Sequence, residues 1–379
     1  MKKKKVIVGL SGGVDSSVAA YLLLQQGYDV EGLFMRNWDS AANNDILGNP
    51  DVNNDVCPQE EDFIDAQKVA DHLGIKLHRH DFVGEYWDNV FTYFIDEYKK
   101  GRTPNPDILC NKYIKFAAFR EVAKELGAEY FAYGHYARTR VNGEEVEMLR
   151  GVDNNKDQTY FLSQLTQEQL RNTLFPVGEI KKPEVRRIAL EMNIPTATKK
   201  DSTGVCFIGE RNFKQFLMNY IYTKPGDICA DDGVVIGRHD GLMYYTIGQR
   251  KGLSIGGHKD YENLPWFVIG KDLENNVLKV GQGIDHPDLY ADKAIIEDVN
   301  WIPLKKFSGE LECSAKFRYR QKDTKVILKW TEDGNLVCNM LAPVRAVTPG
   351  QAAVFYHGEL CLGGGIIQAA YFLGELRKY

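Results

Sequence analysis

The sequence lacks several features that mark common classes of protein. No apolar run approaches the roughly 18 residues that a membrane span needs. The first five residues, MKKKK, lead into a strand pattern without the apolar core of a signal peptide. The formal net charge of −5 gives no overall signal for nucleic-acid binding, so any nucleic acid must meet a local basic face. We therefore expect a cytoplasmic protein without a membrane contact.

The cysteines also exclude common arrangements, because they are odd in number, widely scattered and without a C-x-x-C pair. They are Cys57, Cys110, Cys206, Cys229, Cys313, Cys338 and Cys361. A disulfide scaffold or zinc knuckle is not expected, and reduced thiols are the default. His78 and His80 share a face of one expected strand, but no third ligand lies near them in sequence. We therefore predict no metal site there.

The length of 379 residues predicts two or three domains, and the composition is that of an ordinary soluble globular protein. Over residues 1–210, apolar strands alternate with helical patterns, which predicts an α/β domain with a parallel sheet. Beyond this part, helical spacing nearly vanishes and short strands are separated by turn signals. Such strands predict β-barrels or a sandwich. We expect a small central β-rich domain, 211–283, and a C-terminal β-barrel, 284–379.

The stretch SGGVDSS, residues 11–17, lies between an apolar strand and a helical pattern, so it predicts a strand, a tight glycine turn and a helix start. Two adjacent glycines let the backbone approach a ligand, and the amides at a helix start favour a phosphate. The stretch lacks the lysine of a G-x-x-x-x-G-K-[ST] loop, so it suits gripping the pyrophosphate that leaves during adenylation. A serine-capped turn without a ligand is the alternative.

Three further features of the N-terminal domain bear on the sequence interpretation. Met35 ends the second strand, where it lines an adenine or simply fills the core, and the sequence supports both interpretations equally. Gly134 ends a later strand and would let a nucleotide approach the backbone. The Asn- and Asp-rich stretch 40–57 has little periodicity and predicts an exposed loop.

Residues 103–112, TPNPDILCNK, form the next informative stretch. The two prolines hold the backbone extended until the helix starts, so Asp107 and Cys110 project from a rigid loop. Lys112 and Lys115 follow on the next helix, and nearby cations would lower the pKa of a thiol. A lone cysteine is nevertheless more often buried and inert.

Cys206 follows a flexible polar segment and lies near lysines. Cys110 and Cys206 are therefore candidates for a pair of thiols that meet and cycle through a disulfide, and the sequence leaves that meeting open. Two stretches are fit for RNA: the polar run 153–161, and a strand over 311–320 with Lys316, Arg318 and Arg320 on one face and Phe317 and Tyr319 opposite. Each has a plain alternative, a surface loop and a solvated sheet face.

Three motifs in this order make a specific pattern: GLSGGVDS at 9–16, TPNPD at 103–107 followed by Cys110-Asn111, and DSTGVCFIGER at 201–211. The pattern resembles the tRNA-specific 2-thiouridylase family of PP-loop (N-type) ATP pyrophosphatases. YTIGQRKG at 245–252 and FRYR at 317–320 extend the similarity through essentially the whole chain. The resemblance implies an adenine nucleotide α-hydrolase-like fold for the N-terminal domain.

The resemblance also implies a mechanism. ATP with Mg²⁺ adenylates the C2 oxygen of the wobble uridine, a persulfide on Cys206 supplies sulfur, and Cys110 resolves it into a Cys110–Cys206 disulfide, with Asp107 as the third catalytic residue. It implies nucleotide contacts by Gly9, Leu10, Ser11, Gly12, Gly13, Val14, Asp15, Ser16, Met35 and Gly134. It implies tRNA contacts by Asn105, Pro106, Asp107, Lys156, Asp157, Gln158, Arg318 and Tyr319.

The partners implied are tRNA and a cysteine desulfurase or sulfur-relay protein, and we expect a monomer. Two other functions remain as alternatives. A small-molecule amide ligase or amidotransferase would use the same adenylating loop but would need neither cysteine. A nucleotide-regulated RNA-binding protein would hold tRNA without releasing AMP.

Overall fold

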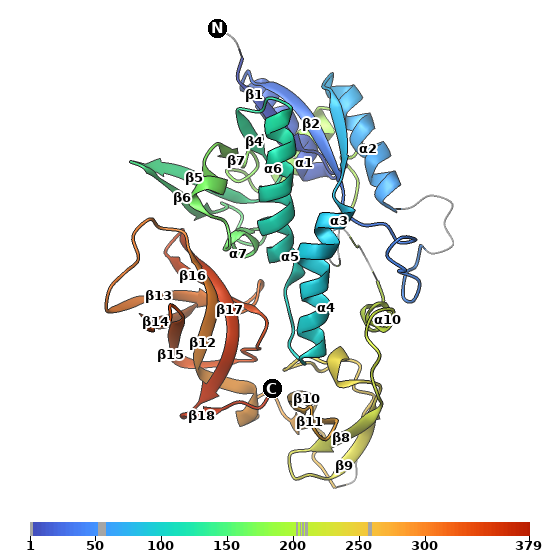
Figure 1. Cartoon of the computed structure of the whole chain (residues 1–379), viewed down its shortest axis with the longest axis vertical. Coiled ribbons are helices and arrows are strands. Elements are labelled where there is room, and N and C mark those ends of the chain that lie inside the picture. The colour runs from blue at the N-terminus through green and yellow to red at the C-terminus, as the bar shows by residue number, and fades with distance from the viewer. Residues whose placement is uncertain are drawn as a thin grey trace.

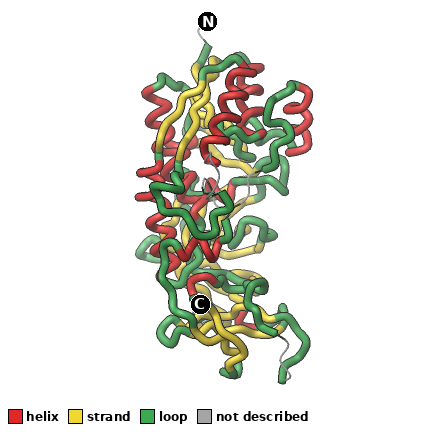
Figure 2. Tube along the Cα trace, turned by 90° about the vertical axis from the view of Figure 1, so that its right-hand side faces the viewer, coloured by secondary structure: helices red, strands yellow, loops and turns green. Residues whose placement is uncertain are grey.

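The computed structural model describes residues 3–51, 58–201, 204, 206, 208, 211–256 and 260–379. An α/β region occupies one end of an elongated molecule, and two β regions, β8–β11 and β12–β18, lie toward the other (Figure 1). Figure 2 shows the same division, because most helices lie in the upper part of the tube and the lower part is mostly strand and loop. No helix in the described part of the chain combines the length and apolarity needed to cross a membrane.

The N-terminal sheet is parallel, as predicted, with the order β3-β2-β1-β4-β7. Its strands are β1 (Lys5–Gly9), β2 (Asp29–Arg36), β3 (Leu77–Asp81), β4 (Tyr130–Ala132) and β7 (Thr173–Leu174). The chain leaves β1 for β2 on one side, and β4 pairs on the other side. This reversal makes the carboxyl ends of β1 and β4 a topological switch point, where open α/β sheets bind ligands.

Alternation along β1 builds a core on each face of the sheet. Val6 and Val8 pack with α1 (Val14–Gln25), α2 (Pro58–Leu73) and α9 (Lys182–Glu191). Ile7 points to the other face and joins a larger aromatic core. That core includes side chains from α3 (Val83–Tyr86), α4 (Thr92–Lys99), α5 (Pro106–Leu109) and α6 (Phe119–Glu125).

Two π-helical segments interrupt the aromatic helices, η1 (Trp87–Phe91) and η2 (Cys110–Ala118). The sequence predicts helix in both places but not this wider winding. Segments with i→i+5 bonding are rare and frequently mark functional sites. The second one begins at Cys110, a predicted catalytic residue.

A hairpin leaves the α/β region, formed by β5 (Ala137–Asn142) and β6 (Glu145–Arg150). Its turn contains Gly143 with φ +63°, the conformation that an Asn-Gly pair favours in a hairpin turn. The hairpin also joins the C-terminal sheet, because Met148 and Leu149 of β6 pair with Cys361 and Leu360 of β17. The sequence does not predict this connection.

Three short helices follow the hairpin: α7 (Thr159–Leu162), α8 (Gln167–Leu170) and, later, α10 (Phe213–Met218). Thr166 and Gln169 form a capping box at the start of α8. The central sheet has the order β10-β11-β8-β9. Its strands are β8 (Gly226–Ala230), β9 (Val235–His239), β10 (Trp266–Asp272) and β11 (Val277–Gln282).

The C-terminal strands close into a six-stranded barrel, because β12 pairs with both β15 and β17 around the order β12-β15-β14-β13-β16-β17. They are β12 (Tyr290–Trp301), β13 (Glu310–Lys316), β14 (Thr324–Trp330), β15 (Leu336–Arg345), β16 (Ala352–His357) and β17 (Leu360–Phe372); β18 (Glu375–Leu376) pairs with β17. Short 3₁₀ turns lie at η3 (Leu242–Tyr244) and η4 (Pro287–Leu289). The predicted fold class is thus confirmed.

One predicted strand is too long. Strand β13 ends at Lys316 rather than continuing to residue 320. The chain then turns, because Gln321 N–H donates to the Arg318 carbonyl (3.1 Å) and the Phe317 N–H donates to Gln321 Oε1 (3.1 Å). The predicted basic face of a continuous strand is therefore wrong beyond Lys316.

The Asn-rich stretch is also not simply an exposed loop in its described half, residues 40–51. Asn43, Asp45 and Asn49 are buried. Asp45 Oδ2 accepts hydrogen bonds from Trp38 Nε1 (3.0 Å) and Arg211 Nε (3.0 Å). Residues 52–57, including Cys57, lie outside the described residues. Local periodicity does not predict this packing, because Arg211 is distant in sequence.

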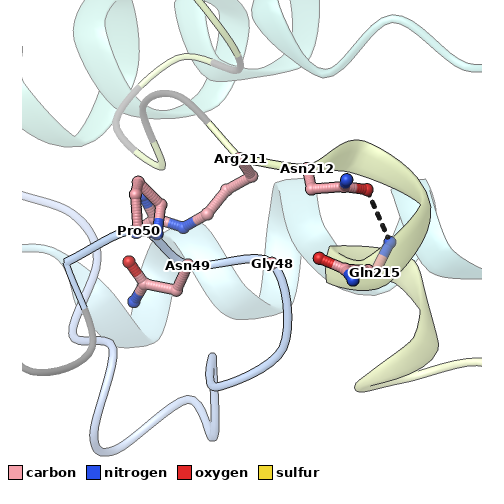
Figure 3. A pocket seen from close by; sticks show the side chains of 6 residues that line it. All are labelled: Gly48, Asn49, Pro50, Arg211, Asn212 and Gln215. Atoms are coloured by element: carbon pink, nitrogen blue, oxygen red, sulfur yellow. Dashed lines mark hydrogen bonds between the residues drawn. The ribbon is translucent and has the colours of Figure 1, made fainter.

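This stretch packs against the start of α10, and a pocket lies between them (Figure 3). It is lined by Gly48, Asn49, Pro50, Arg211, Asn212 and Gln215. The Asn212 N–H donates to the Gly48 carbonyl (2.9 Å), and Leu47 and Asn219 exchange two hydrogen bonds. The stretch thereby ties the segment that follows Cys206 to the α/β region.

We predict that Asp45→Ala destabilises the protein by about 3 kcal/mol, because it removes the nearer of the two carboxylates that pair with the buried Arg211 guanidinium. Urea unfolding monitored by fluorescence measures the change. Asp96→Ala, which removes an exposed i,i+3 partner of Lys99, serves as the control and should leave stability unchanged. Equal effects of the two substitutions would contradict a structural role for the buried pair.

Candidate active site

The loop between β1 and α1, residues 10–13, has the geometry of an anion-binding site. We call this site the seat. Gly12 has φ +73°, and a Cβ there would press into the Asp62 carbonyl of α2, so only glycine fits. Gly13 caps α1 without a side-chain bond, and a Cβ there would meet only Ser11 Oγ, at 3.5 Å. The space beside Gly13 is therefore open. The first-turn amides of α1 have no intrahelical acceptors and point toward that space.

The serines of the loop divide into two groups. Ser16 Oγ donates to the Gly13 carbonyl (3.0 Å) and accepts from Ser11 N (3.3 Å), so it holds the loop closed. Ser17 is buried, and its hydroxyl bonds the same carbonyl (2.8 Å) and Thr196. Ser11 is exposed. Its hydroxyl is therefore the one of the three that best reaches a ligand.

A charged cluster flanks the seat, and the sequence does not place it there. The Asp15 carboxylate accepts from Tyr136 Oη (2.8 Å) and from Lys182 Nζ (2.7 and 2.9 Å). Lys182 is nearly buried and also pairs with Asp201 (2.8 Å). Lys182 therefore lies beside the phosphate-binding loop, and it supplies the positive charge that a lysine within the loop supplies in a P-loop. The Lys-Lys-Pro sequence at 181–183, a basic pair at a helix start, is the signal that points to it.

Asp201 gathers the remaining cations of this cluster. Its carboxylate pairs with Lys156 (2.7 Å) and Arg186 (2.8 Å) in addition to Lys182. Burial would raise the pKa of Asp201, but hydrogen bonds from Lys156 and Lys182 outweigh it and lower the pKa to about 2. Within this cluster three cations face two carboxylates, and such cations suit a polyphosphate.

Gly134 serves the seat indirectly. A Cβ at Gly134 would lie 2.7 Å from Ser16 N and 2.8 Å from the Asp15 carbonyl carbon. The glycine therefore lets the end of β4 approach the first turn of α1. Met35 is 7% exposed, belongs to the aromatic core and lies 3.6 Å from the position of a Cβ on Gly9. This favours the core interpretation, and its contact with adenine stays a prediction.

We predict that Gly134→Ala weakens ATP binding by about tenfold or more, because the new methyl group displaces the first turn of α1. Equilibrium dialysis with ATP measures the affinity. Gly84→Ala is the matched control, since a Cβ there meets nothing within 4 Å. Unchanged ATP affinity in Gly134→Ala would show that the seat is not at this turn.

Two thiols meet on the other side of the sheet. Cys110 Sγ lies 3.8 Å from Cys206 Sγ, although the residues are 96 positions apart. A disulfide bond measures about 2.05 Å, so a small movement joins the two sulfurs. Cys110 is buried and Cys206 is half-buried. The structure thus brings together the two cysteines whose meeting the sequence leaves open.

Asp107 and Tyr86 hold Cys206 by its backbone. Asp107 Oδ1 accepts from Cys206 N–H (3.0 Å), and Tyr86 Oη donates to the Cys206 carbonyl (3.0 Å). Burial raises the pKa of Asp107 against the opposing bond from Cys206 and the charge of Lys115. A rigid Pro-Asn-Pro segment therefore carries both Cys110 and the group that positions its partner.

Hydrogen bonds, nearby charges and burial shift the pKa values of the two thiols in opposite directions. A hydrogen bond from Cys110, with the charge of Lys115, lowers the pKa of Cys206 despite its burial. Burial and the neighbouring Cys206 raise the pKa of Cys110 well above that of an ordinary thiol. Lys115 also acts with burial to lower the pKa of His135, which stays neutral. Cys206 is thus the thiol of the pair that loses its proton more readily, and it is the more accessible one.

We predict that iodoacetamide near neutral pH modifies Cys206 before Cys110, because only Cys206 has a lowered pKa. Lys115→Met removes a cation that favours the thiolate, so Cys206 labelling should need a higher pH. Lys112→Met is the control, since Lys112 bonds Gln164 (3.2 Å). Peptide mass spectrometry across a pH series measures both. An identical pH profile for Lys115→Met and Lys112→Met would contradict the role of Lys115.

The other cysteines in the described part of the chain are less reactive. Burial raises the pKa of Cys313 and Cys361 to about 12 and that of Cys338 well above its usual range. Burial also raises the pKa of the half-buried Cys229. No group of three side chains able to hold a metal ion is found among the residues described.

Several predicted tRNA contacts are engaged inside the protein. Asp157 is buried and accepts from Gly151 N and Thr159 Oγ1, and Gln158 Oε1 accepts from Tyr136 N (2.9 Å). Lys156 pairs with Asp201, Arg318 donates to the Ile247 carbonyl (2.8 Å), and the Tyr319 ring packs on Phe161 (4.4 Å). These bonds hold segments together. A role of the five residues in tRNA binding stays a prediction.

Three buried polar atoms of the predicted site region have no partner among the described residues: Asn105 Oδ1, Asn111 Oδ1 and His135 Nδ1. Asn105 precedes the catalytic helix turn, Asn111 follows Cys110, and the His135 ring lies 5.8 Å from that of Phe116. Native proteins leave few such atoms unpaired, so these call for an explanation such as a bound polar ligand.

A parallel sheet with an anion seat at its switch point, two β regions and a pair of facing thiols define a nucleotide-binding thiol enzyme. Three domain families match the chain: the tRNA methyl transferase HUP domain over residues 4–210, the tRNA methyl transferase PRC-barrel domain over 214–282 and the aminomethyltransferase beta-barrel domain over 291–367.

Relatives named tRNA-specific 2-thiouridylase MnmA match over nearly the full length. The Mesoplasma florum protein is 61% identical over 96% of this chain and 99% of its own, and the Acholeplasma laidlawii protein is 58% identical over 100% of both. The Listeria innocua protein is 55% identical over 99% of this chain and 97% of its own. The chain therefore belongs to the tRNA-specific 2-thiouridylase family of tRNA sulfurtransferases, which confirms the resemblance seen in its motifs.

A solved complex of a 4-thiouridine synthetase with RNA and bound ATP aligns with a TM-score of 0.34 and 18% identity, over 57% of this chain and 50% of that chain. This likeness is too weak to carry an argument.

Proposed function

We propose that this enzyme uses ATP to replace the C2 oxygen of the wobble uridine of tRNA with sulfur. The observation that carries the proposal is the pair of thiols 3.8 Å apart beside Lys115, in the same α/β region as an anion seat. An adenylating enzyme that moves sulfur needs both features, whereas a small-molecule ligase needs only the seat. The name methyl transferase in two of the matching families does not explain a facing thiol pair.

In the first step, the uridine O2 attacks the α-phosphorus of ATP and pyrophosphate leaves. The Gly12-Gly13 turn, the first-turn amides of α1, Ser11 and Lys182 would hold the phosphates. Asp15 is a carboxylate in the first turn of α1, next to this turn, and Mg²⁺ on a nucleotide needs only one or two carboxylates besides phosphate and water. The seat therefore fits ATP with Mg²⁺, which would neutralise charge on the leaving pyrophosphate.

In the second step, the terminal sulfur of a Cys206 persulfide attacks C2 of the adenylated uridine. Cys110 attacks the inner sulfur, the S–S bond of the persulfide breaks, and a Cys110–Cys206 disulfide forms as AMP leaves. The two thiols supply the two electrons that convert persulfide sulfur to the thiocarbonyl. The distance of 3.8 Å supports this exchange, and a reductant must then restore the pair.

The target base must leave the anticodon stack to reach these groups. Asn105, Pro106 and Asp107 would meet it, with the unpaired atoms of Asn111 and His135 available for the uracil edge. Lys156, Asp157, Gln158, Arg318 and Tyr319 would contact or shape the surface for the rest of the tRNA. The divisions 1–210, 211–283 and 284–379 are proposed as its domains.

The sulfur donor would be a cysteine desulfurase or a sulfur-relay protein that transfers its persulfide to Cys206. Cys206 suits this role because its pKa is lowered and it is the more accessible member of the pair. We propose that the protein acts in the cytoplasm as a monomer on tRNA.

We predict that mass spectrometry of tRNA incubated with the wild type, ATP, Mg²⁺ and a persulfide donor shows a sulfur-for-oxygen gain at the wobble uridine. Asp15→Ala should lose AMP release and sulfur gain together, because it breaks the cluster at the seat. Cys206→Ser and Cys110→Ser should lose sulfur gain. Cys229→Ser, which lies on the central sheet, is the control and should keep it.

Three outcomes would contradict the proposal. Full sulfur gain in Cys206→Ser would remove this residue as the sulfur carrier. Adenylation of a small molecule, unaffected when both cysteines are replaced, would favour an amide ligase. Tight tRNA binding without AMP release in the wild type would favour a binding protein.

A further inference from the structure

The four residues before the catalytic segment, 101–104, are held by both β regions. We call them the anchor loop and call residues 105–110 the catalytic segment. We infer that the buried Lys271 of the central sheet is a positioning residue for sulfur transfer, because it fixes the anchor loop and thereby the catalytic segment. This inference rests on the proposed function and names a residue that no motif marks.

The C-terminal barrel holds the anchor loop through close contacts between their backbones. Thr103 N–H donates to the Pro349 carbonyl (3.0 Å), and Gln351 Nε2 donates to the Thr103 carbonyl (2.7 Å). Gly350 has φ +89°, and a Cβ there would lie 2.9 Å from Thr103 N. The turn between β15 and β16 therefore binds the anchor loop through its backbone, with no room for a side chain.

The central sheet contacts the first residue of the anchor loop, Gly101. Lys271 Nζ on β10 donates to the Gly101 carbonyl (2.8 Å), and Lys271 is 5% exposed. A Cβ on Gly101 would lie 3.0 Å from Leu273 Cδ2. Thr246 Oγ1 lies 3.3 Å from Thr103 Oγ1. The lysine thus crosses from the central sheet to the α/β region to make a single directed bond.

Arg102 completes the grip with charge. Its guanidinium pairs with Glu297 of β12 (3.0 Å) and with Glu97 of α4 (3.4 Å). Every residue of the loop from Gly101 to Thr103 therefore contacts a β region. The extended Pro104-Asn105-Pro106 backbone that follows is too stiff to absorb a shift, so a displaced anchor moves Asp107 and Cys110.

The contact continues from Asp107 to the second thiol. Asp107 Oδ1 accepts from Cys206 N–H (3.0 Å), so the position of Asp107 also sets that of Cys206. The path runs from Lys271 through the anchor loop to both sulfurs. A loss of the first bond is expected to widen or misalign the 3.8 Å approach of the thiols.

The burial of Lys271 also indicates that this residue does more than stabilise the fold. No ion pair joins it to any residue that the structure describes, and a buried ammonium with one carbonyl acceptor is costly. Burial accordingly lowers its pKa to about 7. A methionine of similar length would fill the same space without that cost. A residue that costs stability yet fixes a catalytic loop is expected to separate stability from activity when replaced.

Lys271→Met tests the inference, with Lys279→Met as the matched control. Lys279 is exposed on β11 and pairs in register with Gly270, so it shares the sheet but not the contact. We expect Lys271→Met to keep or raise the melting temperature. We expect about a tenfold slower oxidation of the Cys110–Cys206 pair by a mild oxidant and a similar fall in kcat for tRNA thiolation, with KM for ATP unchanged. Lys279→Met should match the wild type.

The oxidation assay needs neither tRNA nor ATP, so it tests the positioning role even if the proposed function fails. Failure of the proposed function would instead show as a wild type that thiolates no tRNA. Wild-type oxidation rates in Lys271→Met would overturn the inference, as would a parallel fall in melting temperature and rate. If Lys271→Met does not fold, Gln351→Leu on the barrel side carries the test, since it removes the bond to Thr103.

Discussion

The site depends on one constraint: two thiols from distant parts of the chain must face each other, and their pKa values must differ. Cys110 begins a π-helical segment fixed in the aromatic core, and Cys206 is held by its backbone between Asp107 and Tyr86. Lys115 favours the thiolate at Cys206, and burial keeps the proton on Cys110. The geometry therefore assigns a sulfur acceptor and a resolving thiol without a further group.

The rest of the molecule supports this pair in two ways. The reversal of strand order beside β1 brings Gly134 against the first turn of α1 and shapes the anion seat, with Lys182 and Asp15 at its edge. The central sheet and the barrel together hold the anchor loop before the catalytic segment. The two β regions are thus part of the support of the active site, in addition to any role toward tRNA.

Much of this arrangement could be predicted from the sequence because local rules determine it. Alternating apolar runs predict the parallel strands, the Gly12-Gly13 turn before a helical pattern predicts the seat, and Asn142-Gly143 predicts a hairpin. The motifs around Cys110 and Cys206 indicate the family. These features depend on neighbours within a few residues, so a linear reading finds them.

The features that were missed depend on contacts between distant segments. Lys182 and Lys271 look like ordinary basic residues until the fold buries them against Asp15 and Gly101. The stretch 40–51 looks exposed because its partners lie beyond residue 210, and the strand predicted to reach residue 320 ends at Lys316 because Gln321 turns the chain. No local pattern carries this information.

The measurement that tests the central claim most directly is a single turnover with isotopically labelled sulfur loaded as a persulfide on Cys206. The labelled wobble 2-thiouridine and the Cys110–Cys206 disulfide are then counted in the same quenched sample. We expect one disulfide for each labelled 2-thiouridine, formed at the same rate. Labelled 2-thiouridine that appears while both thiols stay reduced would contradict the account, because the sulfur would then have reached the base without the facing pair.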